Sequence, residues 1–503
     1  MIHVNSKKPA VLGLVVALGL VLGSVAFAQE DPTPTFTRAE PLGTEIDARP
    51  GARDVLQLEQ CVAQALQAND ALVAEKLRMA ELEGQMDQAL STGLPTLDLV
   101  GNWARSRDPS IALDSTFGGG GGMAPPPGSP DWFQDWLGGF GSLIPAVTDI
   151  PAQSFLTTNL NLNWTINPVL ISGAVGAAKL AITRQGESIH SVENRTVEST
   201  VLAFHSIIKA ADRIHAVEAQ LANQRELVDI MKMRYELGLA TRLDTLQAAV
   251  TLANIRPQLS IARAVLKNEG ARLNAVMGLP PATPLKIANQ QIVETQTIVD
   301  GVALGLAQNR PELMATQYFI DILGRNRKAQ SSERYPYLTV YGAYGYVGKE
   351  FDTVFDDGHD SWRASVAINW KIFDGLLTKG LLAQTDAQIR RTEAELTGER
   401  RLVQVQVLDI LANLRMARQV LAAVILNLER SEEVLDESLL MLQLGKINYL
   451  DVLVSEANRA EAQSNVIDAK YEVLALTAGL KRALGFSPLL PLNAIPGLVS
   501  EVN

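Results

Sequence analysis

The chain has 503 residues, a formal net charge of -11 and a hydrophobic content of 47%. This acidic balance argues against a surface that binds phosphates, so nucleic acid is not an expected partner. The single cysteine, Cys61, excludes a disulfide framework, and we interpret its side chain as a small buried apolar group without chemistry.

The first 53 residues predict an export signal followed by an extended arm. Two lysines precede an apolar run, and Ala26-Phe27-Ala28 is a small-x-small cleavage site, so residues 1–28 are expected to form a signal peptide. Residues 29–53 contain four prolines and predict an extended N-terminal arm. No later stretch reaches the roughly 20 apolar residues of a spanning helix, so we expect an exported chain without a helical anchor.

Residues 54–299 are expected to form a first repeat that begins with a helix and two strands. Apolar residues at three- and four-residue spacing predict a helix from 54 to about 90. Alternation of apolar and polar residues predicts strands over 97–104 and 156–164, each wetted on one side. The intervening residues, about 105–154, are rich in glycine and proline and lack a usable period, which favours a long surface loop.

The rest of this repeat predicts a hairpin of two very long helices. No proline occurs over 176–237, and the apolar stripe there predicts a rod of about 90 Å. Gly238 fits the left-handed position that ends a helix, and Thr241 and Asp244 fit the cap that begins the next one. The tip of the hairpin is therefore expected near 238–244.

The hairpin pattern occurs a second time. The sequence RYELGLATRLDTLQAA at 234–249 matches LQLGKINYLDVLVSEA at 442–457 with a shift of about 207 residues, far too long for a solenoid unit. Gly445 and Asn448 take the roles of the first glycine and cap, so a second tip is expected near 445–451. We therefore predict an internal two-fold repeat produced by tandem duplication.

Residues 300–486 are expected to form the second repeat, followed by a C-terminal tail at 487–503. Strands are predicted over 338–347 and 362–370, joined by a loop of about 348–360. The repeats align with a shift of about 240 residues before their strands and about 206 after them. The difference, about 35 residues, predicts an insertion in the long loop of the first repeat, because such connections tolerate length changes.

Tryptophans mark the apolar side of the predicted strands. Trp362 and Trp370 lie on one face, about 26 Å apart, whereas Arg363 lies on the other. Together with Trp103 and Trp164, they predict the aromatic girdles of a membrane β-barrel whose polar face lines a wet lumen. The alternative is a soluble hairpin whose tryptophans pack on a core.

The number of strands predicts an oligomer. Four strands cannot close a membrane barrel, and unpaired strand edges are not tolerated in lipid. Eight strands give an interior that side chains fill, so a conduit needs about twelve, which three chains supply. The expected fold is mainly α with a membrane β-barrel: a homotrimer with four strands per chain, continued by a long α-helical barrel of packed hairpins.

Taken together, the chain resembles the TolC-type outer-membrane efflux proteins. The resemblance covers nearly the whole mature chain and rests on LQLEQCVAQALQAND at 56–70, the two tip motifs, WKIFDG at 370–375, and the helix-end pairs Leu273/Gly278 and Leu480/Gly485. It implies a trimeric channel in the bacterial outer membrane with a helical tunnel in the periplasm. A periplasmic adaptor would join it to an inner-membrane pump or ABC exporter, so tripartite efflux and type I secretion both stay open as functions.

The resemblance also implies a gate at the periplasmic tip. Asp451 occupies the position of one aspartate ring of the family, whereas the position one turn later is Val454. Asp244 matches an aspartate of the family's closing lock, but the tyrosine and arginine partners of that lock correspond here to Leu442 and Ile447, so the lock is missing.

A replacement for the lock is our hypothesis. Arg242, or as a second choice Lys446, would form a charge pair with Asp451 or Asp244. The alternative is that both aspartates only cap helices. The residues expected to meet the adaptor lie in the tip turns: Gly238, Leu239, Ala240, Thr241, Gly445 and Asn448.

Two other classes of protein are alternatives to a channel. An enzyme is disfavoured because no nucleophile motif surrounds a serine and the histidines at 190, 205, 215 and 359 lack ligand spacing, so no metal or cofactor is expected. The acidic cluster of Asp352, Asp356, Asp357 and Asp360 lacks the Ca²⁺-loop pattern and fits a solvated loop better than an ion site. A secreted coiled-coil scaffold without membrane insertion would use the same helical stripes.

Overall fold

The computed structural model describes residues 55–106, 128–142, 153–289, 296–348, 354–355 and 358–499, all within one unit, Ala52–Asn503. The expected signal peptide and N-terminal arm lie outside the described residues, as do most of the 105–154 loop and Asp352, Asp356 and Asp357.

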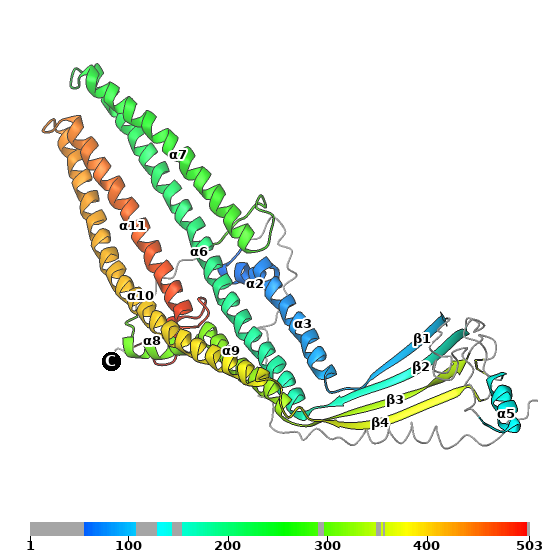
Figure 1. Cartoon of the computed structure of the whole chain (residues 1–503). Helices are drawn as coiled ribbons and strands as arrows, with labels where there is room; N and C mark the ends of the chain where they lie inside the picture. Colours follow the sequence, from blue (N-terminus) through cyan, green and yellow to red (C-terminus); the bar gives the residue numbers. More distant parts are fainter. Residues whose placement is uncertain are drawn as a thin grey trace, which may run out of the picture. The chain divides into compact units, whose positions relative to one another are not determined.

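The described part is mainly helical with one sheet (Figure 1). Its first half contains α2 (Leu58–Ala68), α3 (Asp70–Ser91), β1 (Thr96–Ser106), α5 (Asp131–Ser142), β2 (Gln153–Ile166), α6 (Pro168–Glu236) and α7 (Arg242–Val276). Its second half contains α8 (Asp300–Leu306), η3 (Ala307–Asn309), α9 (Pro311–Ser331), η4 (Ser332–Arg334), β3 (Tyr337–Gly348), β4 (Asp360–Asn369), α10 (Leu377–Gln443), α11 (Tyr449–Ala483) and η5 (Leu492–Ala494). All four strands overlap the stretches in which the sequence alternates.

Two helices occupy the stretch for which the sequence pattern predicts one. α2 and α3 are separated at Asn69, whose backbone is extended and whose side-chain oxygen accepts from the N–H groups of Ala71 and Leu72. Asparagine competes for backbone partners in this way, which makes it a cap. Its amide also donates to the Val276 carbonyl at 2.9 Å, so the end of α7 holds the break in place.

Ordered structure occurs within the segment expected to be a long surface loop and within the C-terminal tail. Within the 105–154 loop, α5 is a helix on which Phe133 stacks with Trp136 and meets Trp132 edge-on. In the C-terminal tail, Leu492 and Leu498 are fully buried among residues of α8, α10 and α11. Amino-acid composition predicts neither the helix α5 nor the burial of the tail, because both depend on which apolar side chains come into contact.

The sheet is antiparallel throughout, in the order β1-β2-β3-β4. Its register places apolar residues opposite one another: Leu97 pairs with Leu162, Val340 with Val366, and Leu338 with Ile368. Since side chains alternate along a strand, this register collects the apolar residues on one face and the amides and hydroxyls on the other. β1 and β4 are the edge strands.

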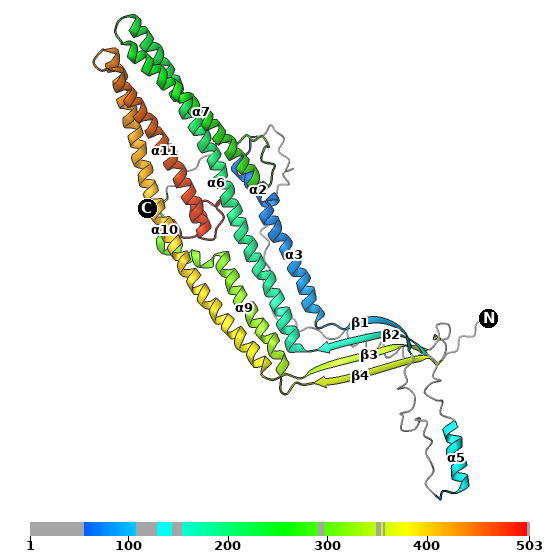
Figure 2. The same cartoon turned by 45° about the horizontal axis from the view of Figure 1, so that its top comes forward.

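The long helices form two hairpins that contact each other through α6 and α11. Toward the tips the helices lie in the order α7, α6, α11, α10, and toward the sheet in the order α3, α6, α9, α10 (Figure 2). The 69 residues of α6 correspond to about 100 Å. α6 and α9 approach closely at Gly173, where a Cβ would lie 2.6 Å from the backbone nitrogen of Ala329. Within the described residues, no helix has an apolar stretch sufficient for a bilayer span.

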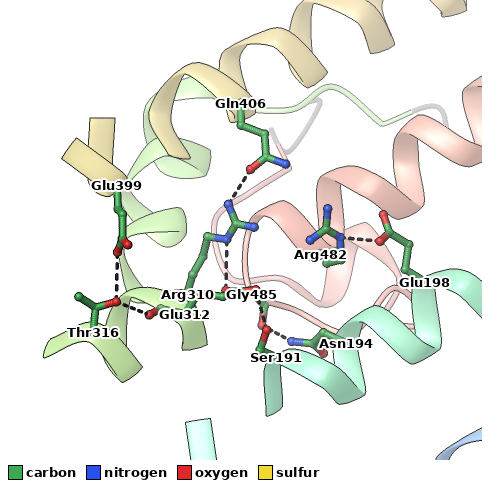
Figure 3. Close-up of polar contacts among 10 residues, drawn as sticks. All are labelled: Ser191, Asn194, Glu198, Arg310, Glu312, Thr316, Glu399, Gln406, Arg482 and Gly485. Carbon is green, nitrogen blue, oxygen red and sulfur yellow. Dashed lines mark hydrogen bonds and ion pairs between the residues drawn. The ribbon is translucent and has the colours of Figure 1, made fainter. Parts of the chain in front are cut away.

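A polar cluster joins four helices where α9 begins (Figure 3). Glu198 of α6 pairs with Arg482 of α11 at 2.5 Å, and burial raises the pKa of the Glu198 carboxyl although Arg482 opposes this shift. Arg310, before α9, donates to Gln406 of α10 at 2.8 Å, and Ser191 of α6 donates to Glu312 of α9 at 2.8 Å. The cluster therefore fixes the two halves against each other.

Candidate functional site

The sheet presents an apolar face to its surroundings. Leu99, Val366 and Ile368 are large apolar side chains that stay exposed, the last to 73%. Trp103, Trp164 and Trp362 lie on this same face, and Trp370 follows directly after β4. Exposed apolar side chains occur on all four strands of this face, and a contiguous exposed apolar patch marks a protein-interaction or membrane surface.

The tryptophans fall into two pairs by position. Trp103 and Trp362 lie toward the loop end of the sheet, and Trp362 is 71% exposed. Trp164 and Trp370 lie at the helical end, where their indole N–H groups donate to the carbonyls of Gly93 at 2.9 Å and Arg334 at 3.2 Å. Tryptophans at both edges of an apolar band, those at the helical end with their indole N–H groups hydrogen-bonded, suit a lipid–water boundary.

The opposite face of the sheet is polar and hydrogen-bonded across strands. Asn163 donates to Asp98 at 3.4 Å, Tyr341 donates to Asn161 at 3.2 Å, and Asn369 donates to Thr339 at 3.0 Å. Most of these groups are amides and hydroxyls, which bind water without carrying charge; Asp98 and Arg363 add one charge of each sign to this face.

The two tips have the same backbone design. At the first, Gly238 has φ +70°, and the N–H groups of Gly238 and Leu239 donate back to Tyr235 and Arg234. At the second, Gly445 has φ +71°, and Gly445 and Lys446 donate back to Leu442 and Met441. Both are Schellman ends, in which glycine adopts a positive φ that costs other residues energy.

Each following helix begins with a reciprocal capping box. The Asp244 N–H donates to Thr241 Oγ1 at 3.2 Å, and the Thr241 N–H donates to the Asp244 carboxylate at 2.8 Å. Asn448 and Asp451 exchange equivalent bonds at 3.1 and 3.2 Å. Both candidate gate aspartates are therefore helix caps in a single chain.

The candidate gate cations do not pair with these aspartates in a single chain. Within the described residues, neither Arg242 nor Lys446 takes part in an ion pair. Arg242 and Lys446 are exposed, as are Gly238 and Leu239, two of the residues expected to meet the adaptor. The proposed charge pair between tips is therefore a prediction about neighbouring chains.

Three residues near the second tip form a buried polar layer that sequence reasoning missed. Tyr449 of α11 is 2% exposed and accepts from Gln224 of α6 at 2.9 Å; the same amide donates to the Ala248 carbonyl at 3.2 Å. Glu456 is 3% exposed, beside Asn223 and Arg459, and burial raises the pKa of its carboxyl. In the described part of the chain, neither Gln224 Oε1 nor Glu456 Oε1 has a hydrogen-bond partner.

A signal for this layer does exist in the repeat. Tyr449 aligns with Arg242 and Glu456 aligns with Ala249, although the flanking glycine, cap and aspartate repeat faithfully. At both positions the residue of α11 is buried and the residue of α7 is exposed, so here the difference in residue type coincides with different surroundings. Elsewhere in the described residues, no three His, Cys, Asp or Glu side chains gather to hold a metal ion.

Comparisons with known proteins agree with this architecture. The model of the family described as outer membrane efflux protein matches residues 61–279 and 305–486. The chain is 24% identical over 342 residues to the outer membrane efflux protein BepC of Brucella suis, covering 67% of this chain and 74% of BepC.

Solved structures share the fold. The outer membrane protein VceC of Vibrio cholerae superposes with a TM-score of 0.70 at 20% identity, covering 86% of this chain and 96% of VceC. The CmeC outer membrane channel of Campylobacter jejuni superposes with a TM-score of 0.72 at 14% identity, covering 86% of this chain and 87% of CmeC. The chain therefore belongs to the outer membrane efflux protein family.

Proposed function

We propose that three copies of this chain form a passive outer-membrane channel that serves a tripartite efflux or type I secretion system. The observation that carries the proposal is the sheet, which has an apolar face, a polar face and two free edges. In lipid, free edges leave backbone groups unsatisfied at a cost of several kcal/mol each. Pairing β4 of one copy with β1 of the next removes them, and three copies give about twelve strands around a wet lumen.

The helices support the same closure. The lateral borders of the chain are α7 and α3 on one side and α10 on the other, since α6, α9 and α11 lie between them. Leu243 and Val250 of α7 and Leu402 and Met416 of α10 are large apolar side chains that a single chain leaves exposed. Packing α10 of one copy against α7 and α3 of the next would bury these stripes.

The two-fold repeat is part of the proposal. The order helix, strand, strand, long helix, returning helix occurs twice, and the two tips share their end and cap geometry. Duplication explains why three chains make a ring of six similar hairpins. The polar layer at Tyr449 makes the two hairpins of each chain unequal.

The tips are the proposed gate and the proposed contact with a periplasmic adaptor. Asp451 and Asp244 place two carboxylates per chain at the end of the helical tunnel, and three copies would place six around its axis. Capping and gating are compatible roles, because a capping carboxylate keeps its charge. Arg242, or second Lys446, would close the ring by pairing with an aspartate of a neighbouring chain.

Conductance in planar lipid bilayers tests the channel and its gate. We expect the purified protein to run as a heat-modifiable trimer on gels and to conduct. Asp451→Asn and Arg242→Ala are each expected to raise the open fraction, with Lys446→Ala as the comparison for the second-choice cation. A monomer that does not conduct would contradict the proposed channel. Wild-type conductance in both variants would show that charge plays no part in the gate.

Fractionation separates the channel from a coiled-coil scaffold. A scaffold would wash off the outer membrane with salt or urea, whereas a barrel needs detergent. A crosslinker at the exposed Leu239 should capture the adaptor, and the same crosslinker at Phe355, at the loop end of the sheet, is the control.

A further inference from the structure

The connection between β4 and α10 differs from the corresponding connection between β2 and α6. In the first half, Asn167 alone separates the strand from the helix; it is 6% exposed and caps α6 through the Leu170 N–H. In the second half, residues 370–376, here called the β4–α10 junction, separate the two elements. The first connection lies in the interior of the chain, whereas the second lies at a lateral border.

The β4–α10 junction is held in one conformation by local contacts. Trp370 donates to the Arg334 carbonyl at 3.2 Å, and Lys371 pairs with Glu333 at 2.6 Å. The Asp374 carboxylate accepts from the Thr378 N–H at 2.8 Å and also from the Thr378 hydroxyl. These contacts anchor both ends of the junction.

Two consecutive residues of the junction have left-handed backbones. Gly375 has φ +66° and Leu376 has φ +72°; among the described residues, Leu376 is the one non-glycine with a positive φ. A leucine in this region is strained, and strain persists where surrounding contacts impose it. The junction therefore has a defined shape that its own sequence does not prefer.

This rigid junction exposes its apolar side chains. Ile372 is 84% exposed and Phe373 is 77% exposed, and Leu376 and Leu377 follow beside them. Holding large apolar groups in water in a fixed, strained arrangement is unfavourable unless a partner covers them.

The inner connection indicates what that partner is. Inside the chain, the β2–α6 connection faces the start of the second half, where Ile166 pairs with Leu338 and Gly173 of α6 meets Ala329 of α9. Among the described residues of its own chain, the β4–α10 junction has no such neighbour, because β4 is an edge strand of the sheet. The segment equivalent to that neighbour is the end of α3 and the start of β1, where Leu90, Leu94 and Leu97 are exposed.

We propose that the β4–α10 junction is the contact that fixes one copy of the chain to the next, with Ile372 and Phe373 packing on Leu90, Leu94 and Leu97 of a second copy. This inference rests on the proposed trimer and specifies where its subunits join. The contact between two copies then repeats the contact between the two halves of one chain. β4 of one copy pairs with β1 of the next, α10 packs on α3, and the junction fills the bend between the sheet and the helices.

Disulfide crosslinking tests the contact directly. In a Cys61→Ala background, Phe373→Cys combined with Leu94→Cys is expected to give mainly crosslinked dimers and trimers that a reductant reverses. Phe355→Cys with Leu94→Cys is the matched control, since Phe355 is also an exposed phenylalanine, at 63% against 77% for Phe373, but lies beyond β3. It is expected to give no crosslink.

Trimer stability gives a second, independent measurement. Ile372→Ala with Phe373→Ala is expected to lower the temperature at which the trimer dissociates on gels by about 5 °C or more, whereas Phe355→Ala leaves it unchanged. Circular dichroism checks that each variant chain keeps its helices.

The outcomes separate this inference from the proposed function. A wild-type trimer that conducts, together with no crosslink and an unchanged dissociation temperature, overturns the contact alone. The same result with labelling of the Phe373→Cys thiol by a lipid-phase maleimide assigns the junction to the membrane and likewise overturns the inference. A wild-type monomer overturns both proposals.

Discussion

The first turns of α7 and α11 are two copies of one motif that lie in different surroundings. Both helices begin after a Schellman glycine with a capping box, but Arg242 is exposed where Tyr449 is buried, and Ala249 is exposed where Glu456 is buried. α11 packs on α6 of the other hairpin, whereas α7 lies at a border of the chain. This difference shows that the capping contacts depend only on nearby residues, whereas the role of each hairpin depends on what its returning helix packs against.

The largest expected difference between the tips comes from Tyr449. Tyr449→Ala removes a buried aromatic ring and one of the two hydrogen bonds that the buried Gln224 amide donates, which costs about 3–5 kcal/mol. Arg242→Ala at the equivalent exposed position should change stability by at most about 0.5 kcal/mol. Opening free energies from hydrogen exchange in the first turns of α11 and α7 measure both; equal losses at the two tips would contradict the asymmetry.

The tip glycines should behave alike. Gly238→Ala and Gly445→Ala each force a left-handed alanine, at a cost of about 1–2 kcal/mol. Nothing lies within 4 Å of the Cβ that either substitution adds, so the cost is a backbone effect in both. Thermal unfolding of each variant in detergent checks this, and a cost at one tip alone would show that the two turns are not equivalent.

The local stability of the second tip should depend on pH, and that of the first tip should not. Burial raises the pKa of Glu456 in the folded chain, so the folded state takes up this proton more readily than the unfolded chain. Local stability of α11 should therefore rise as pH falls through the folded-state pKa, and it should be lower once Glu456 is ionised. Glu456→Gln should remove this dependence and stabilise the neutral-pH state by on the order of 1 kcal/mol.

The control for this response is α7, which carries Ala249 at the equivalent position. Hydrogen exchange between pH 4 and 7, corrected for intrinsic exchange rates, should show the dependence in the first turns of α11 and not in α7. The same dependence in both helices, or its survival in the Glu456→Gln variant, would assign it to another group.

The smallest effect is expected from the capping aspartates. Asp244→Asn and Asp451→Asn keep a hydrogen-bond acceptor but lose the charge at a helix N-terminus, at a cost of about 0.3–1 kcal/mol each. The same comparison of α7 and α11 by hydrogen exchange measures this cost. If Asp451→Asn alters conductance far more than stability, the carboxylate does more than cap its helix.

The sequence predicted some elements of the fold better than others. The strands, the tips and the long hairpins follow from short patterns around residues such as Gly238 and Trp362, because each pattern acts within a few positions of the chain. The break at Asn69 and the helix α5 have weaker local signals, and the single-helix and loop expectations overlooked them.

The tip site was reached only in part. The turns and caps were expected from the sequence, but the buried layer of Gln224, Tyr449 and Glu456 was not. A tyrosine one residue after an N-cap is compatible with an exposed surface, and Tyr449 is buried because residues of α6, α7 and α10 pack around it.

The sequence by itself determined where the long helices end at the two tips, which side of each strand is apolar, and the family to which the chain is similar. These properties depend on backbone dihedrals and on period-two or period-3.6 spacing, which neighbouring residues set. Only the tertiary structure decided which polar groups are buried, that Leu492 and Leu498 of the tail complete the core, and that Ile372 and Phe373 project from a strained junction. Burial and strain depend on contacts between residues distant in the chain, and no local pattern encodes those contacts.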